Sequence, residues 1–504
     1  MNGGADHPDR PAVRELLRRR RVELMVLAGL MGTFAVVGVA AVRSAGASTV
    51  AVDRESDAAY VERLTTASMT TPFGEGGRRS PLAVAATEST ATESAADRDD
   101  EVVRRVVVDV GTAASDRTWR GVGAALTDAS VELITGRPDA IAALFDPSLP
   151  GGAGLDLVRL PLSATDFSTR SWTWALTGEE VTPTPEALAA VAVVDDVLAL
   201  RPDLAVIGAA WSSPPEMRTD PSAPGGALVD VEGYGELLAG QVDWLLERGV
   251  PLTAVSLGNE PGHVGDAPTL AMSDAQMVAL SHALHPTFAR AGVELLALDH
   301  NWDDAERAAD LLDAGAFDAA AFHCYGGSPQ AMAAVDAPVF VSECTATTGA
   351  WHESVGWMAR ELIGESIRAG STGLVMWNLA LDPDHGPKQP GGCTDCRGLL
   401  TIDPVADSIA TTPEFSVLAH LAAAADPGAA ILDVDRIDGL PLAAFVNPDG
   451  SLGIFGHNDR PEPVALTFRI GDGSTVHVAV DSWGIFSVRT PFGAASSTGP
   501  AASG

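Results

Sequence analysis

Two acidic residues that follow apolar runs are the strongest chemical signal in this sequence. The run Val255–Leu257 leads into Asn259-Glu260-Pro261, and the run Pro338–Val341 leads into Ser342-Glu343. A strand that ends on a carboxyl residue places that acid at the rim of a core. Two carboxylates beside one sugar ring are the minimum equipment for cleaving a glycosidic bond. The sequence therefore predicts that Glu260 and Glu343 form a catalytic pair.

Eight apolar runs alternate with helix-like or loop segments through the middle of the chain. They cover residues 121–126, 157–162, 204–210, 253–257, 294–298, 319–322, 338–341 and 373–377. Near-continuous apolar strands are typical of a parallel sheet that is covered on both faces. Eight alternations over about 300 residues are typical of a (β/α)8 TIM barrel, so we expect an α/β fold of this kind. A doubly wound sheet is the alternative, but no G-x-G-x-x-G follows any of the runs.

The chain changes character at both ends of the predicted barrel, which we place at residues 118–426. Residues 427–492 contain short β-type runs separated by turns such as Asn447-Pro-Asp-Gly450, and predict an antiparallel β-sandwich. We expect residues 102–117 to supply the first strand of this appended domain. Residues 493–504 are predicted to be a disordered tail.

The N-terminal residues read as an export segment followed by a spacer. Arg18–Arg21 precede an uncharged run over residues 24–42 and then Ala45-Gly-Ala47, which predicts a signal peptide over residues 1–47. The run is nearly long enough to span a bilayer, so a membrane anchor is the alternative. Residues 48–101 are rich in Ala, Ser, Thr, Glu and Asp, and predict a disordered linker. Either reading makes the protein secreted or extracytoplasmic.

Charge and cysteine content narrow the partners. The formal net charge is −35, which argues against nucleic acid and anionic membrane surfaces as partners. We expect a carbohydrate or glycolipid substrate, no cofactor, no metal and no obligatory protein partner. Of the four cysteines, Cys393 and Cys396 predict a short-loop disulfide, while the pairing of Cys324 and Cys344 stays open.

Further polar and aromatic residues follow the predicted strands and would meet at one end of the barrel. They are Asp166, Trp211, Asn259, His323, Tyr325, Trp377 and Asn378. Aromatic rings can stack on the C–H faces of a pyranose, and Asp, Asn and His can bind its hydroxyls. These residue types indicate a sugar site.

Several motifs make the chain resemble glycoside hydrolase family 30, the family of glucosylceramidases and related β-glycanases. They occur in order as Gly121-Val-Gly-Ala-Ala-Leu-Thr-Asp128, Arg159-Leu-Pro-Leu-Ser-Ala-Thr-Asp-Phe-Ser168, Trp211-Ser-Ser-Pro-Pro-Glu-Met-Arg-Thr219, Asn259-Glu-Pro261, Ser342-Glu-Cys344 and Trp377-Asn-Leu-Ala-Leu-Asp382. The resemblance covers roughly residues 102–490 and includes the β appendage. It implies a retaining β-glycoside hydrolase of the glucosylceramidase or β-1,6-glucanase type.

The same resemblance implies roles for single residues. Glu260 would be the acid/base and Glu343 the nucleophile, and a raised pKa is expected for Glu260 from burial and from the charge of Glu343. Asn259 would hold the sugar 2-hydroxyl, and Tyr325 would orient Glu343. Asp166, Trp211 and Trp377 would line the sugar subsite.

Other roles stay open from sequence. Arg159 is either a simple ion-pair residue or a brace for the catalytic carboxylates, and His323 is either a structural barrel residue or part of the substrate site. Trp172 and Trp174 could form an outer subsite. Cys324 stands where a tryptophan is common in the family.

Three alternative functions remain. One is a β-xylosidase or another β-glycanase of the same family, and the second is a non-catalytic carbohydrate-binding relative. The third is a metallohydrolase that uses Asp299, His300 and His323, although no H-E-x-x-H motif supports it. The sequence does not distinguish glucosylceramide, β-1,6-glucan, β-glucosides and β-xylosides as substrates.

Overall fold

The computed structural model describes residues 62–65, 104–178, 180–221, 225–263, 268–347, 351–471, 473 and 475–492. The predicted export segment over residues 1–47 and the predicted tail over residues 493–504 lie outside the described residues. So does the predicted linker, except for Glu62–Thr65, which form the short strand β1. No helix in the described ranges is both long and apolar enough to cross a membrane.

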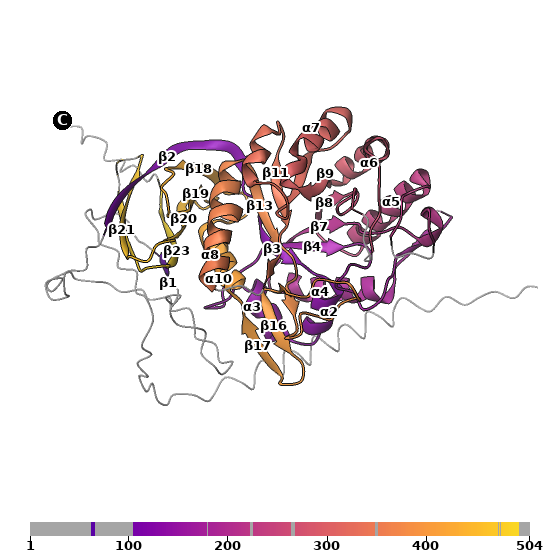
Figure 1. The fold of residues 1–504 in the computed structure, drawn as a ribbon, viewed down its shortest axis with the longest axis horizontal. Helices are drawn as coiled ribbons and strands as arrows, with labels where there is room; N and C mark the ends of the chain where they lie inside the picture. The colour runs from indigo at the N-terminus through magenta and orange to yellow at the C-terminus, as the bar shows by residue number, and fades with distance from the viewer. Residues whose placement is uncertain are drawn as a thin grey trace, which may run out of the picture. The chain divides into compact units, whose positions relative to one another are not determined.

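Eight parallel strands close into a barrel, as the sequence predicts (Figure 1). In chain order they are β3 (Gly121–Ala125), β4 (Leu157–Pro161), β7 (Ala205–Ala209), β8 (Leu252–Ser256), β9 (Glu294–Asn301), β10 (Ala319–His323), β11 (Val339–Glu343) and β13 (Ser371–Met376). Apolar side chains such as Ile207, Leu296 and Phe340 fill the interior. The barrel is therefore a packed core, and the chemistry must lie at its ends.

Helices surround the barrel and join its strands. They are α2 (Asp128–Ile134), α3 (Pro138–Phe145), α4 (Pro185–Leu198), α5 (Val231–Glu247), α6 (Asp274–Ala291), α7 (Ala305–Ala314), α8 (Trp351–Trp357), α9 (Ser366–Arg368) and α10 (Pro413–Ala424), with the π-helix η4 (Met358–Glu365) between α8 and α9. Their ends carry local signals. Ser273 and Gln276 form a capping box at the start of α6, and Gly292 ends that helix with φ 76°.

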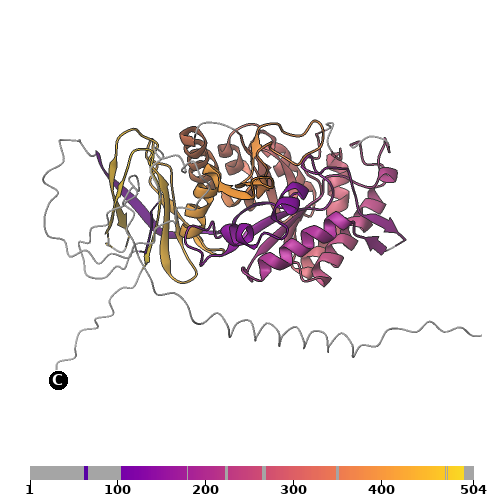
Figure 2. The same cartoon turned by 90° about the horizontal axis from the view of Figure 1, so that it is seen from below.

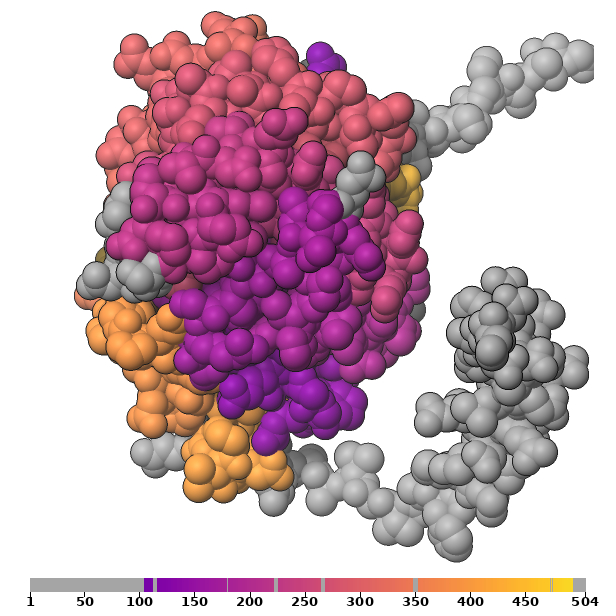
Figure 3. Space-filling model, turned by 90° about the vertical axis from the view of Figure 1, so that its right-hand side faces the viewer, coloured from indigo at the N-terminus to yellow at the C-terminus, as the bar shows by residue number. Residues whose placement is uncertain are grey.

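Small elements that the sequence did not predict decorate the barrel. They are β5 (Ala175–Thr177) with β6 (Glu180–Thr182), β12 (Ala346–Thr347) with β15 (Cys396–Arg397), β14 (Ala380–Leu381) with β16 (Leu400–Asp403) and β17 (Ser408–Thr411), and the 3-10 turns η1 (Pro215–Met217), η2 (Trp302–Asp304) and η3 (Pro329–Ala334). The β16–β17 hairpin lies beside the first barrel helices, where Arg137 pairs with Asp407 (Figure 3). These strands are too short to show a period in the sequence.

The appended domain is built around one long strand, β2 (Arg104–Thr118). The first half of β2 pairs with β21 in parallel, and its second half pairs with β18 antiparallel. The other strands are β18 (Ala430–Val434), β19 (Leu442–Val446), β20 (Ser451–His457), β21 (Val464–Ile470), β22 (Thr475–Val480) and β23 (Ile485–Pro491). Alternate residues of these strands, including Val108, Leu466 and Phe486, form a common core. Strand β1 adds to β23 at the outer edge.

The strands of the appendage lie beside the barrel (Figure 2). Buried apolar residues of the two parts pack into one core. Trp119, between β2 and β3, is 1% exposed, and its ring packs edge-on against Phe445 of β19 with centroids 5.5 Å apart. The backbone N–H of Trp119 also donates to Ala429 O at 2.8 Å. Both ends of the barrel segment are thereby tied to the same sheet.

We expect Phe445→Ala to destabilise the protein by about 3–5 kcal/mol, because it leaves a cavity between barrel and appendage. The free energy of unfolding in urea measures the loss. Val405→Ala is the matched control, since Val405 is 95% exposed. A loss of less than about 1 kcal/mol for Phe445→Ala would mean that the contact does not join the two parts.

Candidate active site

Glu260 and Glu343 meet at the carboxyl ends of the barrel strands. Glu343 is the last residue of β11, and Glu260 lies in the turn after β8. One oxygen of each carboxyl group and one ring nitrogen of His323 all lie within 4.8 Å of one another. Retaining glycosidases hold their carboxyl groups about 5–5.5 Å apart, and inverting enzymes hold them about 6.5–9.5 Å apart. The short separation matches the retaining geometry.

The turn that carries Glu260 is held in an uncommon backbone conformation. Glu260 has φ 47°, and Asp299, at the end of the neighbouring strand, has φ 54°. The Glu260 N–H donates to Asp299 O at 3.0 Å, and the Asn259 N–H donates to Ala210 O at 2.6 Å. Left-handed conformations of non-glycine residues persist only where surrounding contacts hold them. These two hydrogen bonds fix the direction of the Glu260 side chain.

Arg159, from β4, is the buried cation of the site. Its side chain is 0% exposed. Nη1 pairs with Glu343 Oε2, and Nη2 donates to Asp299 Oδ2 at 2.9 Å and to Asn259 Oδ1 at 2.7 Å. Burial lowers the pKa of Arg159, but the charges of Asp299 and Glu343 raise it further, so the guanidinium stays protonated. The sequence left two roles open for Arg159, a simple ion-pair residue or a brace for the catalytic carboxylates. Its contact with Glu343 supports the second role.

His323 links Glu260 to Asp299 inside the barrel. Its Nδ1 lies 3.0 Å from Glu260 Oε1, and its Nε2 lies 3.1 Å from Asp299 Oδ1. Burial lowers the pKa of His323, but the charge of Glu343 and the hydrogen bonds to Asp299 and Glu260 raise it to about 9. His323 is therefore an imidazolium that donates from both nitrogens.

The pKa of Glu260 differs from the sequence expectation. Burial does raise it, but the hydrogen bond and the charge of His323 lower it more, so the net shift is downward. The proton that the pair shares therefore lies on His323. The expectation failed because the sequence could not show a cation 3.0 Å from the carboxyl oxygen.

Asp299 makes more contacts in the site than the sequence indicated. It is 1% exposed and accepts hydrogen bonds from Arg159, from His323 and from Ser342 Oγ, the last at 2.6 Å. Burial raises its pKa, but Arg159 and His323 lower it well below the ordinary range. The sequence shows only that Asp299 follows the fifth apolar run, and this position suggested a metal ligand. In the structure Asp299 instead accepts hydrogen bonds from two cations, Arg159 and His323.

Tyr325 contacts the opposite side of Glu343. Its hydroxyl donates to Glu343 Oε1 at 2.9 Å, which is the contact expected of a residue that orients Glu343. Burial of the hydroxyl and the charge of Glu343 raise its pKa well above the ordinary value. Glu343 is thus held on one oxygen by Arg159 and on the other by Tyr325.

The predicted sugar-stacking tryptophans are mostly covered. Trp211 and Trp377 are each 5% exposed and stack on each other with centroids 5.1 Å apart. The Arg159 guanidinium lies 4.6 Å from the Trp211 centroid. Little of either ring is left open to a sugar face, because each ring packs beside the buried cation.

Asp166 and Asn378 lie in different surroundings. Burial and the charge of Glu343 raise the pKa of Asp166 to about 7, so Asp166 interacts electrostatically with the Glu343 carboxylate. Asn378 is 0% exposed, and its Oδ1 accepts from Thr127 Oγ1 at 2.7 Å. Asn378 therefore lies beneath the site surface.

The proposed outer subsite at Trp172 and Trp174 is not formed. Trp174 is 2% exposed and packs edge-on against Trp244, with centroids 5.2 Å apart. Trp172 is 7% exposed and donates from Nε1 to Asp128 Oδ2 at 2.6 Å. Both rings are buried in the core, so neither presents a face on which a sugar could stack.

Glu260, His323 and Glu343 are close enough to be considered as metal ligands. A histidine must be neutral to ligate, and both ring nitrogens of His323 already face carboxylates. His300, which the metallohydrolase alternative also requires, pairs with Asp304 instead.

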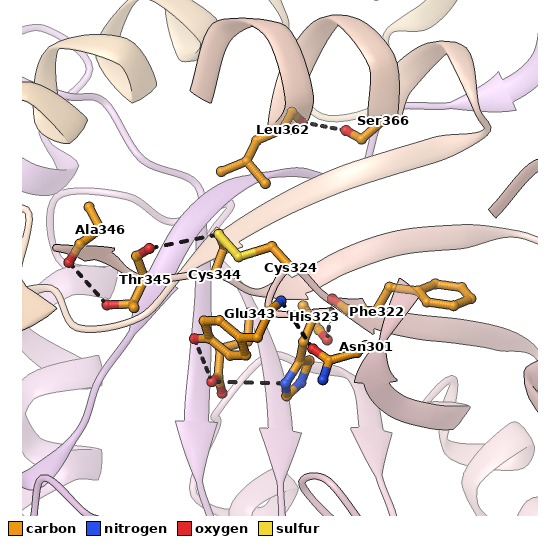
Figure 4. The surroundings of a disulfide bond; sticks show 12 residues. Asn301, Phe322, His323, Cys324, Glu343, Cys344, Thr345, Ala346, Leu362 and Ser366 are labelled. Carbon is orange, nitrogen blue, oxygen red and sulfur yellow. Dashed lines mark hydrogen bonds and ion pairs between the residues drawn. A yellow bond between two sulfur atoms is a disulfide. The ribbon is translucent and has the colours of Figure 1, made fainter. Parts of the chain in front are cut away.

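Both cysteine pairs are disulfide-bonded in the structure. Cys324 and Cys344 join the ends of β10 and β11 with Cα atoms 5.3 Å apart, next to His323 and Glu343 (Figure 4). Cys393 and Cys396 close the loop after β13. In that loop Gln389 N donates to Asp166 O at 2.8 Å, so the loop forms one wall of the site.

No family model matches the chain. The "Endo-1,6-beta-D-glucanase neg1" of Aspergillus fumigatus is 24% identical over 435 residues, which cover 76% of this chain and 86% of that protein. The "Lysosomal acid glucosylceramidase" of Mus musculus is 24% identical over 396 residues, which cover 69% of this chain and 76% of that protein.

Solved structures share the fold. "The endo-beta1,6-glucanase BT3312" has a TM-score of 0.69 at 24% identity and covers 76% of this chain and 93% of its own. The "Catalytic domain of GH30 xylanase C" from Talaromyces cellulolyticus has a TM-score of 0.62 at 18% identity and covers 76% of this chain and 100% of its own. With its sequence relatives and two carboxylates at the barrel end, the chain is a β-glycoside hydrolase. The resemblance to glycoside hydrolase family 30 is confirmed.

The ion pairs of His323 with Glu260 and Asp299 should make the stability of the protein depend on pH. The pKa of His323 is raised from 6.5 to about 9, so its ion pairs stabilise the fold fully below pH 6.5 and are lost as the pH rises through 9. The difference in unfolding free energy between wild type and His323→Gln should therefore shrink over this range. Urea titrations at a series of pH values measure it.

Phe445→Ala serves as the control in the same series, since it removes no ionisable group. Its difference from wild type should stay nearly constant with pH. A His323→Gln difference that is equally flat would show that His323 is not protonated in the folded protein.

Proposed function

We propose that this protein hydrolyses β-glucosidic bonds in a β-1,6-linked glucan by double displacement, with Glu343 as nucleophile and Glu260 as acid/base. The observation that carries the chemistry is the pair of carboxyl oxygens within 4.8 Å at the barrel end. The substrate class is supported by relatives named as endo-1,6-glucanases from Aspergillus fumigatus and Neurospora crassa.

In the first half-reaction a Glu343 oxygen attacks the anomeric carbon while the glycosidic C–O bond breaks. Arg159 and Tyr325 each hold one oxygen of Glu343, which fixes the direction of attack. The departing oxygen takes its proton from Glu260. That proton comes from the hydrogen bond shared with His323, so Glu260 is an acid only when His323 passes the proton to it.

In the second half-reaction water replaces Glu343 at the anomeric carbon. Glu343 is now an ester without charge, and its charge was one of the causes that raised the pKa of His323. A neutral His323 beside an ionised Glu260 is therefore more favourable than in the free enzyme. Glu260 takes the proton of the water, and two displacements restore the original anomeric configuration.

The sugar-binding roles of Asp166 and Asn259 are also part of this proposal, and Trp377, which is 5% exposed, supports them from below. Asn259 is 8% exposed and its Oδ1 accepts from Arg159, which leaves its amide nitrogen to donate to a sugar hydroxyl. Trp211, Asn378 and His323 contribute from beneath the surface by supporting the residues above them.

Export from the cytoplasm is proposed from Arg18–Arg21 and the uncharged run that follows. The two disulfide bonds support this, because disulfides persist mainly in oxidising compartments.

The test compares wild type with Glu343→Gln and Glu260→Gln. Wild type should release oligosaccharides from β-1,6-glucan and form a covalent adduct with a 2-deoxy-2-fluoro-β-glucoside. Glu343→Gln should form no adduct. Glu260→Gln should hydrolyse the glucan about 10²–10⁴-fold more slowly, because the leaving oxygen is no longer protonated. It should still be labelled rapidly by a fluoroglucoside with a dinitrophenyl leaving group.

Exposed Glu353→Gln is the control and should behave as wild type. Wild-type activity in both active-site variants would refute the two-glutamate mechanism. Cleavage of glucosylceramide or xylan with β-1,6-glucan left intact would reassign the substrate and leave the mechanism standing.

A further inference from the structure

The Cys324–Cys344 disulfide lies directly behind the reacting groups. Cys324 stands between His323 and Tyr325 in the sequence, and Cys344 follows Glu343. Neighbouring residues of an extended chain point to opposite sides. His323 and Glu343 point into the site, and the two sulfur atoms meet on the other side of the strands (Figure 4). Tyr325 also faces the site, where its hydroxyl donates to Glu343.

The disulfide joins β10 and β11 just beyond the point where hydrogen bonding between these strands ends. Strands β10 and β11 pair in parallel, and His323–Glu343 is the last pair of their ladder in the described residues. The register shifts just before this pair, between Phe322 and His323. A bulge of this kind loosens the ladder at that point. The bond from Cys324 to Cys344 is the next connection along the two strands.

Tyr325 depends on this connection because its own segment offers little other support. Residue 325 is 46% exposed and is followed by Gly326 and Gly327 in a turn. Besides its contact with Glu343, its backbone N donates to Asn301 Oδ1 at 3.0 Å and its ring packs edge-on against His323 with centroids 6.0 Å apart. The next residue, Gly326, accepts from Asp303 N at 3.2 Å.

The other end of the disulfide is fixed firmly. Cys344 is 0% exposed, and its carbonyl accepts from Trp377 N at 2.8 Å. The disulfide therefore ties an exposed turn to the buried end of β11.

We propose that the Cys324–Cys344 disulfide is a positioning element that holds the Tyr325 hydroxyl against Glu343 and so sets the rate of nucleophilic attack. The inference rests on the proposed role of Glu343. It assigns the two cysteines to the chemistry of the site and not only to the stability of the fold. A disulfide that closes this short loop stabilises the fold as well, so the test must separate the two effects.

The test is a double-mutant cycle between the disulfide and Tyr325. Four proteins are compared: wild type, Cys324→Ala/Cys344→Ala, Tyr325→Phe, and the triple variant. The readout is the first-order rate of labelling by the fluoroglucoside at saturation, together with the half-saturating concentration. Cys324→Ala/Cys344→Ala should label about 10–100-fold more slowly with a nearly unchanged half-saturating concentration, because a small misplacement slows attack without removing a binding contact.

The decisive result is the coupling. If the disulfide acts through Tyr325, the triple variant should label at nearly the rate of Tyr325→Phe alone, because the hydroxyl that the disulfide positions is already gone. Losses that multiply would show independent, purely structural effects and would overturn the proposal. Labelling of Cys324→Ala/Cys344→Ala at the wild-type rate would overturn it as well.

The second disulfide supplies a matched comparison. Cys393–Cys396 lies in the loop against Asp166, on the sugar-binding side of the site. Cys393→Ala/Cys396→Ala should raise the half-saturating concentration, and its effect should multiply with that of Tyr325→Phe. Val478→Ala, in the core of the appended domain, shows what lost stability alone does to the labelling rate.

Reversible reduction covers the case in which Cys324→Ala/Cys344→Ala does not fold. Folded Cys393→Ala/Cys396→Ala enzyme is reduced with a phosphine and then reoxidised, with the thiols counted by mass spectrometry. The labelling rate should fall on reduction and return on oxidation, and an unchanged rate would overturn the proposal. Failure of wild type to be labelled at all would instead refute the proposed function.

Discussion

The buried guanidinium of Arg159 is the interaction on which the rest of the site depends. Three carboxylates, of Glu260, Asp299 and Glu343, lie together at the end of an apolar barrel. Carboxylates that share a buried site cannot all stay ionised without compensating charge. Arg159 contacts Asp299 and Glu343, and the imidazolium of His323 contacts Asp299 and Glu260. These two cations thus balance the charge of the three carboxylates, and His323 shares a proton with Glu260.

The backbone around the site brings these charged side chains together from several strands. Arg159 reaches the site from the middle of β4, and it meets Asp299 from β9 and Glu343 from β11. Glu260 and Asp299 have left-handed backbone conformations, and both side chains contact His323. Trp211 and Trp377, which the sequence predicts to line the sugar subsite, lie beside the Arg159 guanidinium and keep water from its faces.

The barrel was predictable because its strands are buried on both faces. The runs at 157–162 and 319–322, for example, became β4 and β10 with nearly the same bounds. Strand β18 was missed although four of its five residues are apolar. The β14–β16–β17 sheet was missed because its strands are too short to show a period in the sequence. The contact of Tyr325 with Glu343 agrees with the family resemblance.

Properties that depend on distances between remote residues could not be predicted in the same way. The lowered pKa of Glu260 comes from a histidine that is 63 positions away in the chain and 3.0 Å away in space. The burial of Trp174 and Asn378 depends likewise on neighbours contributed by other segments. The Cys324–Cys344 bond needed the register of β10 against β11, which no residue pattern reveals.

The stereochemistry of the first product tests the central claim, that the two carboxylates lie close enough for double displacement. Proton NMR can follow the anomeric signals while the enzyme cleaves a β-1,6-linked glucan oligosaccharide. The geometry predicts that the β-anomer appears first and that the α-anomer grows in later by mutarotation. Initial release of the α-anomer would mean that water attacks directly, and it would contradict a nucleophilic role for Glu343.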